Sequence, residues 1–212
     1  MWWWVWYRIS ITIYKKKVIG YDIDAKTISI TKSFFKKSSV FFTPDIGDIE
    51  RNTYELVIMF QVIEHFTNKY MHEILKSISK DLLKKDGIFI CSTPNKLVTS
   101  PGLKKPVMVF HNFEFTPSSF KHVLEKHFKK VTILGQLETS GSLKPKKHQM
   151  RRVYMTRWLS QIELVRMIAR HLPIKLKYLF MGNLIKDTRT YVLAKTEKDI
   201  KNSFTLIAVC QN

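Results

Sequence analysis

The sequence has few cysteines and no long apolar run, and each absence excludes a class of protein. Only two cysteines occur among 212 residues. Cys91 and Cys210 both fall in apolar, strand-like runs, which predicts buried free thiols and not a disulfide framework or a cysteine metal site. No apolar stretch reaches the roughly 18 residues that a membrane span needs. The N-terminus, M-W-W-W-V-W-Y-R, lacks the basic leader and the small-residue cleavage site of a signal peptide, so we expect a cytoplasmic protein.

Acidic residues are also scarce. Seventeen Asp and Glu stand against 36 Lys and Arg, a formal net charge of +19. Such a field favours anionic partners: nucleic acid, acidic or phosphorylated sugars, or an anionic membrane surface. A lysine-rich surface that is merely solvated explains the charge equally well. The length and the 45% apolar content predict one soluble globular domain spanning residues 1–212.

Residues 54–66, Y-E-L-V-I-M-F-Q-V-I-E-H-F, organise the rest of the chain. Their first half is a short, continuous apolar run, which is typical of a strand buried on both faces of a sheet. Gln61, Glu64 and His65 follow where this strand should end. In open α/β sheets, ligands bind beyond the carboxyl ends of the strands, so these three polar residues predict a site.

The segment before it has the pattern of a nucleotide-binding α/β fold. Residues 18–24, V-I-G-Y-D-I-D, predict a strand whose acidic tip, Asp22, accepts hydrogen bonds from ribose hydroxyls, with Ile23 beside the adenine. A helix is expected over residues 25–35 and a third strand over residues 40–43. Asp45 and Asp48 follow in a P-D-x-G-D sequence that equally predicts a plain turn, just as Asp22 equally fits a solvated turn.

The second half of the chain carries two further strings. Residues 82–95, L-L-K-K-D-G-I-F-I-C-S-T-P-N, predict the end of a helix begun near Lys69, a glycine turn, and a buried strand. Residues 110–120, F-H-N-F-E-F-T-P-S-S-F, place Thr116 as an N-cap and Pro117 at the first helical position. Strands are expected over residues 131–134 and 204–209.

Together these strings resemble the class I S-adenosylmethionine (SAM) dependent methyltransferases, in a type 11/23-like branch that includes ubiquinone-pathway O-methyltransferases. Residues 54–66 resemble the fourth-strand motif of that family, residues 82–95 resemble LLKPGGxLxISTPN, and residues 110–120 resemble FHxxEFTPEEF. The resemblance implies a Rossmann-like α/β sheet of order 3-2-1-4-5-7-6, with strand 7 antiparallel and inserted beside strand 5. It also implies SAM as cofactor and methyl transfer to a small-molecule, sugar or lipid acceptor, anionic or polar in character.

The resemblance assigns cofactor contacts to four residues. Asp22 and Ile23 would meet the ribose and adenine, Asp45 fits the acidic residue that bonds the adenine amino group, and Gln61 would face the methionine part. Each role is assigned only because the residue occupies the matching position of the family's motif.

His65 and His111 are the candidate general bases, with Glu64 as an orienting residue. A histidine packed at the start of a helix is an equally good interpretation of His65, and Glu64 in a first turn also suits the helix dipole. Some relatives, including ubiquinone-pathway and small-RNA O-methyltransferases, hold a divalent metal with E-x-x-E-H. Here Gln61 takes the first place, and because an amide replaces a charged ligand poorly, we predict no metal.

The glycine-rich loop of the family has no counterpart before Val18, so the first strand and this loop are missing or replaced. Met and Trp each have one codon, and residues 1–7 read one base later encode C-G-G-G-x-G, which resembles that loop about twenty residues before Asp22. We therefore hypothesise that residues 1–17 begin out of frame. Upstream nucleotides that encode no apolar strand in that frame would contradict this. A genuine strand over residues 8–14, where Ile alternates with Ser or Thr, is the alternative. Whether the chain is active stays open.

Residues 138–201 form an insertion before the last predicted strand. From residue 139 to 162 there is no acidic residue, and apolar residues from Trp158 to Leu172 recur at helical spacing. A packed helix with a solvated basic face is favoured over a substrate lid, a membrane-docking surface or an RNA contact. The membrane-docking surface and the RNA contact define the alternative function, which is that of a non-catalytic basic protein that binds RNA or an anionic membrane.

Overall fold

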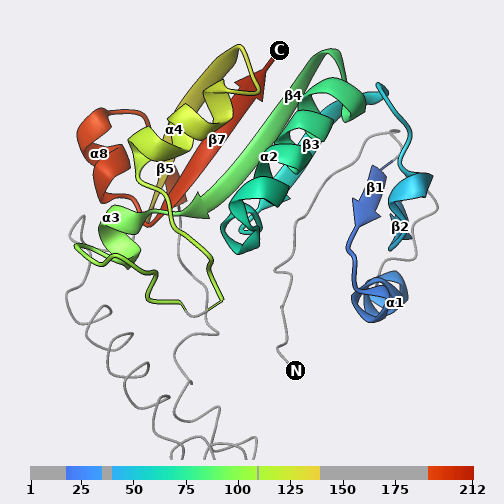
Figure 1. Ribbon diagram of the computed structural model, residues 1–212, viewed down its shortest axis with the longest axis horizontal. Coiled ribbons are helices and arrows are strands. Elements are labelled where there is room, and N and C mark those ends of the chain that lie inside the picture. Colours follow the sequence, from blue (N-terminus) through green and yellow to red (C-terminus); the bar gives the residue numbers. More distant parts are fainter. Residues whose placement is uncertain (1–17, 35–39, 109, 139–190) are drawn as a thin grey trace, which may run out of the picture. The chain divides into compact units, whose positions relative to one another are not determined.

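The computed structural model describes residues 18–34, 40–108, 110–138 and 191–212 (Figure 1). They belong to two compact units, Met1–Arg51 and Asn52–Asn212, and each unit is described by itself. Within the described residues, no helix is both long and apolar enough to cross a membrane. The out-of-frame hypothesis for residues 1–17 and the helix predicted around residues 158–172 lie outside the described residues.

The first unit is a β-α-β arrangement. Strand β1 (Val18–Tyr21) and strand β2 (Val40–Thr43) pair in parallel, and helix α1 (Ala25–Phe34) connects them. The helix begins where the Asp24 carboxylate accepts hydrogen bonds from the backbone N–H groups of Lys26 and Thr27, as at an ordinary helix N-terminus. A 3-10 turn, η1 (Ile46–Asp48), follows. The two strands and the helix predicted for this region are confirmed.

The second unit is built on a five-stranded sheet of order β3-β4-β7-β5-β6. β3 and β4 are parallel, whereas β7 runs antiparallel to both of its neighbours, β4 and β5. These strands correspond to 4-5-7-6 of the predicted order, and β1 with β2 correspond to 2 and 3. The strands are β3 (Tyr54–Phe60), β4 (Leu83–Pro94), β5 (Lys130–Glu138), β6 (Tyr191–Ala194) and β7 (Thr205–Gln211).

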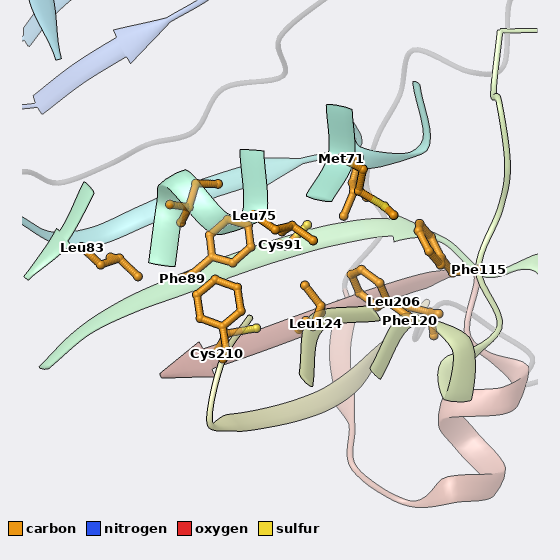
Figure 2. Packing of buried hydrophobic residues seen from close by; sticks show 14 of the residues in the cluster. Met71, Leu75, Leu83, Phe89, Cys91, Phe115, Phe120, Leu124, Leu206 and Cys210 are labelled. Atoms are coloured by element: carbon orange, nitrogen blue, oxygen red, sulfur yellow. The ribbon is translucent and has the colours of Figure 1, made fainter. Parts of the chain in front are cut away.

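Two helices cover one face of this sheet (Figure 1). Helix α2 (Asn68–Ser77) continues into a π-helical turn, η3 (Ile78–Leu82), and helix α4 (Pro117–Glu125) lies beside it. Figure 2 shows the resulting core between helices and sheet. α2 contributes Met71 and Leu75, α4 contributes Phe120 and Leu124, and the sheet contributes Phe89, Cys91, Leu206 and Cys210.

A short local signal fixes the start of α4, and a pair of histidines distant in sequence joins the two helices. Thr116 caps α4 in a capping box with Ser119, and Pro117 occupies the first turn, so this predicted helix start is confirmed. Nδ1 of His72 on α2 lies 2.8 Å from Nε2 of His127, which follows α4. This imidazole pair joins the two helices.

The two cysteines are free and buried, as predicted. Both side chains lie at the helix-covered face of the sheet, and burial raises both thiol pKa values. That of Cys210 rises to about 12, and that of Cys91 rises well above its ordinary value.

The burial predicted for β3 needs correction. The strand is present, but it is not buried on both faces, because Leu56, Ile58 and Phe60 are exposed. β3 stands at the edge of the five-stranded sheet of its unit, so only β4 pairs with it there.

Two further predictions for this unit need correction. The K-D-G sequence is not a helix-ending turn, because β4 already begins at Leu83 and its register with β3 shifts over the stretch before Ile88. Gly87 also lacks a positive φ; it is glycine because a Cβ there would lie 2.8 Å from the carbonyl oxygen of Tyr54. The insertion is not wholly helical either, since its described end contains β6 as well as the short helix α8 (Glu197–Asn202). β6 pairs with β5 and so extends the sheet by one strand.

Candidate functional site

The predicted cofactor residues of the first unit lie in turns at the ends of β1 and β2. Oδ1 of Asp22 accepts a hydrogen bond from the backbone N–H of Asp24 at 2.9 Å, and Oδ1 of Asp45 accepts one from Gly47 at 2.8 Å. Ile23 is 81% exposed. The turn geometry that the sequence allowed is therefore present, and the contacts with ribose and adenine stay predictions.

Gln61 directly follows β3 in the second unit and is hydrogen-bonded to Ser92 near the end of β4. Its φ of 54° is left-handed, a conformation that costs a non-glycine residue about 1–2 kcal/mol. Its backbone N–H donates to the carbonyl of Ser92 at 3.0 Å, and Nε2 lies 3.2 Å from Oγ of Ser92. Strained backbone of this kind occurs most often at functional sites.

The three predicted catalytic residues come together just beyond this strand end. Glu64 and His65 lie in a 3-10 turn, η2 (Ile63–His65), and His111 comes from the loop before α4. One donor atom from each side chain lies within 4.8 Å of the other two. Across the described part of the chain, no other set of three or more His, Cys, Asp or Glu side chains converges in this way. We call Glu64, His65 and His111 the catalytic cluster, after the role that the sequence predicts for them.

Asn112, which the sequence did not single out, joins the two segments that form the catalytic cluster. Its backbone N–H donates to the carbonyl of Glu64 at 2.9 Å, and its side-chain amide donates to the carbonyl of His65 at 2.6 Å. Nδ1 of His65 in turn lies 3.0 Å from the carbonyl of Phe110. The rings of His65 and His111 meet edge to face with centroids 5.0 Å apart. Hydrogen bonds from both directions therefore hold residues far apart in sequence at one place.

Burial shifts the pKa values of Glu64 and His65 in opposite directions. The Glu64 residue is 1% exposed; burial raises its pKa, although its carboxylate accepts a hydrogen bond from Oγ1 of Thr93 at 3.2 Å. Burial lowers the pKa of His65, which favours the neutral ring. A carbonyl only accepts, so Nδ1 of His65 carries the proton that bonds Phe110, and the lone pair of the neutral ring is on Nε2.

Glu114 is a second residue that the sequence analysis missed. Its Oε1 lies 2.9 Å from Nδ1 of His111, and Oγ1 of Thr99 donates to Oε2 at 2.7 Å. Burial alone raises the pKa of Glu114, but the hydrogen bonds from His111, Ser100 and Thr99 outweigh it and lower that pKa. The signal was the H-x-x-E spacing, which places a carboxylate three residues after the candidate base.

The catalytic cluster also has the donor set of a cation site. Two imidazoles and one carboxylate bind several divalent transition metals in proteins, and the convergence of the three side chains fits such an ion. The amide of Gln61, by contrast, is directed to Ser92. The prediction that no metal binds therefore stays a prediction.

The family is established by comparison with known proteins. A family model described as a methyltransferase domain matches residues 6–132, which is more than half of the chain. The chain belongs to this family of class I SAM-dependent methyltransferases, and the family and fold class predicted from the sequence are confirmed.

Individual relatives agree with this assignment. A probable SAM-dependent methyltransferase of Mycolicibacterium smegmatis is 27% identical over 119 residues, covering 52% of this chain and 42% of that protein. This chain thus spans about two fifths of the length of that relative.

Solved structures agree on the fold alone. A SAM-dependent methyltransferase of Thermotoga maritima, described as a possible histamine N-methyltransferase, has a TM-score of 0.54 at 12% identity, covering 92% of this chain and 72% of that chain. A small RNA methyltransferase has a TM-score of 0.52 at 15% identity, covering 93% of this chain and 20% of that chain.

Proposed function

We propose that this chain binds SAM and transfers its methyl group to an oxygen or nitrogen atom of a small, polar or anionic acceptor molecule. The observation that carries the proposal is the convergence of Glu64, His65 and His111 beyond the carboxyl end of β3. In a sheet of this class, ligands bind at that edge.

The proposed chemistry needs positioning and one proton acceptor. The acceptor atom attacks the methyl carbon in line, the sulfonium C–S bond breaks, and S-adenosylhomocysteine leaves. Holding the two reactants in line supplies much of the rate. The proton of the acceptor group passes to His65 or His111. On His65 the receiving atom is Nε2, because Nδ1 holds the proton that bonds the carbonyl of Phe110. Glu64 is the proposed orienting residue.

A divalent cation is a second candidate occupant of the catalytic cluster. The same convergence supports it, since Glu64, His65 and His111 would be its protein ligands. When bound, such an ion would polarise a hydroxyl group of the acceptor and lower its pKa, and so would supply part of what a general base supplies.

Cofactor binding is the first property to test. Titration calorimetry with SAM and S-adenosylhomocysteine should show saturable binding by the full chain. Because Asp22 is the proposed ribose contact, Asp22→Asn should weaken binding about tenfold, the loss of about one charge-assisted hydrogen bond. Asp86→Asn is the matched control, as Asp86 is exposed at the bulge of β4. Absence of any binding would contradict the proposal for this chain.

Methyl transfer is tested with SAM labelled in its methyl group and separate small-molecule, lipid and RNA fractions. Label should enter small molecules, and His65→Gln or His111→Gln should lower the rate by about 10²–10⁴-fold if that residue is the base. Loss of transfer on chelation, restored by a divalent cation, would instead favour the cation. Binding of RNA or of anionic vesicles without any transfer would favour the non-catalytic alternative.

A further inference from the structure

We propose that Glu114 is a positioning residue of the catalytic cluster: it holds His111 with the proton on Nδ1, so that Nε2 is the atom offered to the acceptor or to a cation. This inference rests on the proposed function of the cluster. It adds a residue that carries no role in that function so far.

The carboxylate of Glu114 contacts His111 and is closed off from solvent. The side chain of Glu114 is 0% exposed, and that of His111 is 9% exposed. Oε1 faces Nδ1 of His111 at 2.9 Å, while Oε2 accepts from Oγ1 of Thr99 at 2.7 Å. A ligand could not reach this carboxylate without displacing His111 or Thr99, so Glu114 acts through the imidazole.

The chemistry of the pair selects one tautomer. An ionised carboxylate only accepts hydrogen bonds, so Nδ1 of His111 must donate. Both carboxylate oxygens of Glu114 face a group that can donate, Nδ1 of His111 and Oγ1 of Thr99, which is the arrangement expected of an ionised carboxylate. A neutral imidazole that donates through Nδ1 carries its lone pair on Nε2. Carboxylates orient metal-bound and catalytic histidines in the same manner elsewhere.

The carboxylate is itself held by a separate segment. Thr99 is the last residue of the short helix α3 (Lys96–Thr99). Oγ1 of Thr99 also lies 2.9 Å from the carbonyl oxygen of Asn95. Ser100, the next residue, is buried, and its Oγ accepts from the backbone N–H of Val107 at 2.9 Å. Glu114 therefore cannot turn freely, and the orientation of His111 follows from the chain after β4.

The test reads the tautomer of His111 directly. Full-length protein labelled with ¹⁵N in its histidine rings is examined by NMR, and the signals of residue 111 are assigned by their loss in His111→Gln. In the native chain, Nδ1 should be protonated and Nε2 should not. Glu114→Gln keeps the shape of the side chain but has a donor as well as an acceptor, so the ring should become a mixture of tautomers. Glu125→Gln, which removes an exposed carboxylate paired with Lys121, should change nothing at His111.

The same variants are then compared for methyl transfer. Glu114→Gln should lower kcat by about 10–100-fold with an unchanged KM for SAM, whereas Glu125→Gln should match the native chain. A native His111 protonated on Nε2 would overturn the inference without any variant, so a Glu114→Gln chain that fails to fold leaves the question decidable. An unchanged tautomer in folded Glu114→Gln, or a changed tautomer with undiminished kcat, would also overturn it. The NMR measurement needs neither SAM nor acceptor, so its outcome is independent of whether the proposed function holds.

Discussion

Asn95 ends the S-T-P-N string, and its side chain joins four backbone groups in the interior. Nδ2 lies 3.2, 3.1 and 2.8 Å from the carbonyl oxygens of Ile200, Lys201 and Ser203, respectively. Oδ1 accepts from the backbone N–H of Leu97 at 3.1 Å. Asn95 is fully buried. The end of β4, the start of α3 and the end of α8 are thus held by one amide, and the direction of each hydrogen bond requires an amide.

Two substitutions separate the volume of this side chain from its hydrogen-bond direction. An amide has two hydrogens, so at most two of the three carbonyls are bonded well at once. With the bond from Leu97, Asn95→Ala removes about three hydrogen bonds at about 1 kcal/mol each, a loss of about 3 kcal/mol in the free energy of unfolding. Asn95→Asp keeps the shape and the bond from Leu97 but places a carboxylate oxygen against three carbonyl oxygens. An uncompensated buried charge costs about 3–5 kcal/mol, so at neutral pH the Asp variant should be at least as unstable as the Ala variant.

The pH dependence distinguishes the two further. The carbonyls raise the folded-state pKa of an Asp at this position above its unfolded value, so stability is lost as pH rises through the folded pKa and regained at lower pH. The Asp variant should therefore approach or exceed the Ala variant in acid.

The assay is urea unfolding followed by far-UV circular dichroism, because all five tryptophans lie outside the described residues. Asn202→Asp is the control, since the side chain of this exposed residue makes one bond, to the carbonyl of Lys198 at 2.9 Å; it should cost less than about 1 kcal/mol. An Asn95→Asp variant no less stable than this control at neutral pH would refute the reasoning.

Three further predictions follow from packing and burial. Gly135→Ala places a Cβ 2.5 Å from Oγ of Ser203, so we expect a loss of about 1–3 kcal/mol in urea unfolding, and a fully stable variant would contradict the packing. Cys91 and Cys210 should resist a thiol reagent in the folded chain and both react in urea, because burial raises both thiol pKa values, that of Cys210 to about 12; rapid labelling without denaturant would contradict their burial. Burial and an adjacent imidazole lower the pKa of His127, so the unfolded chain binds more protons and stability should fall as pH drops below about 6.5; His127→Gln should be less sensitive over the same range of urea-unfolding measurements.

The fold was predictable where a local pattern and its tertiary environment agree. Residues 54–60 form the expected strand, although it is not buried on both faces, and the cap at Thr116 begins its helix because both signals act within a few residues. The reason for Gly87 was not predictable, because the carbonyl of Tyr54 that excludes a Cβ approaches from a different strand. Strand β6 was missed for a related reason, as its pairing with β5 is formed between residues more than fifty positions apart.

The same distinction holds for the candidate site, where some residues were predictable from the sequence and others were not. Glu64, His65 and His111 were found because a motif places each at the end of a predicted strand or in a recognisable loop. What orders them was not found, because Asn112 and Glu114 act on atoms that no spacing rule names: the carbonyls of η2 and Nδ1 of His111. A motif reports which side chains are present, whereas the tautomer of a base depends on the partner of its other nitrogen. For this chain that partner is a buried carboxylate, so the chemistry of His111 is decided by Glu114 as much as by the imidazole itself.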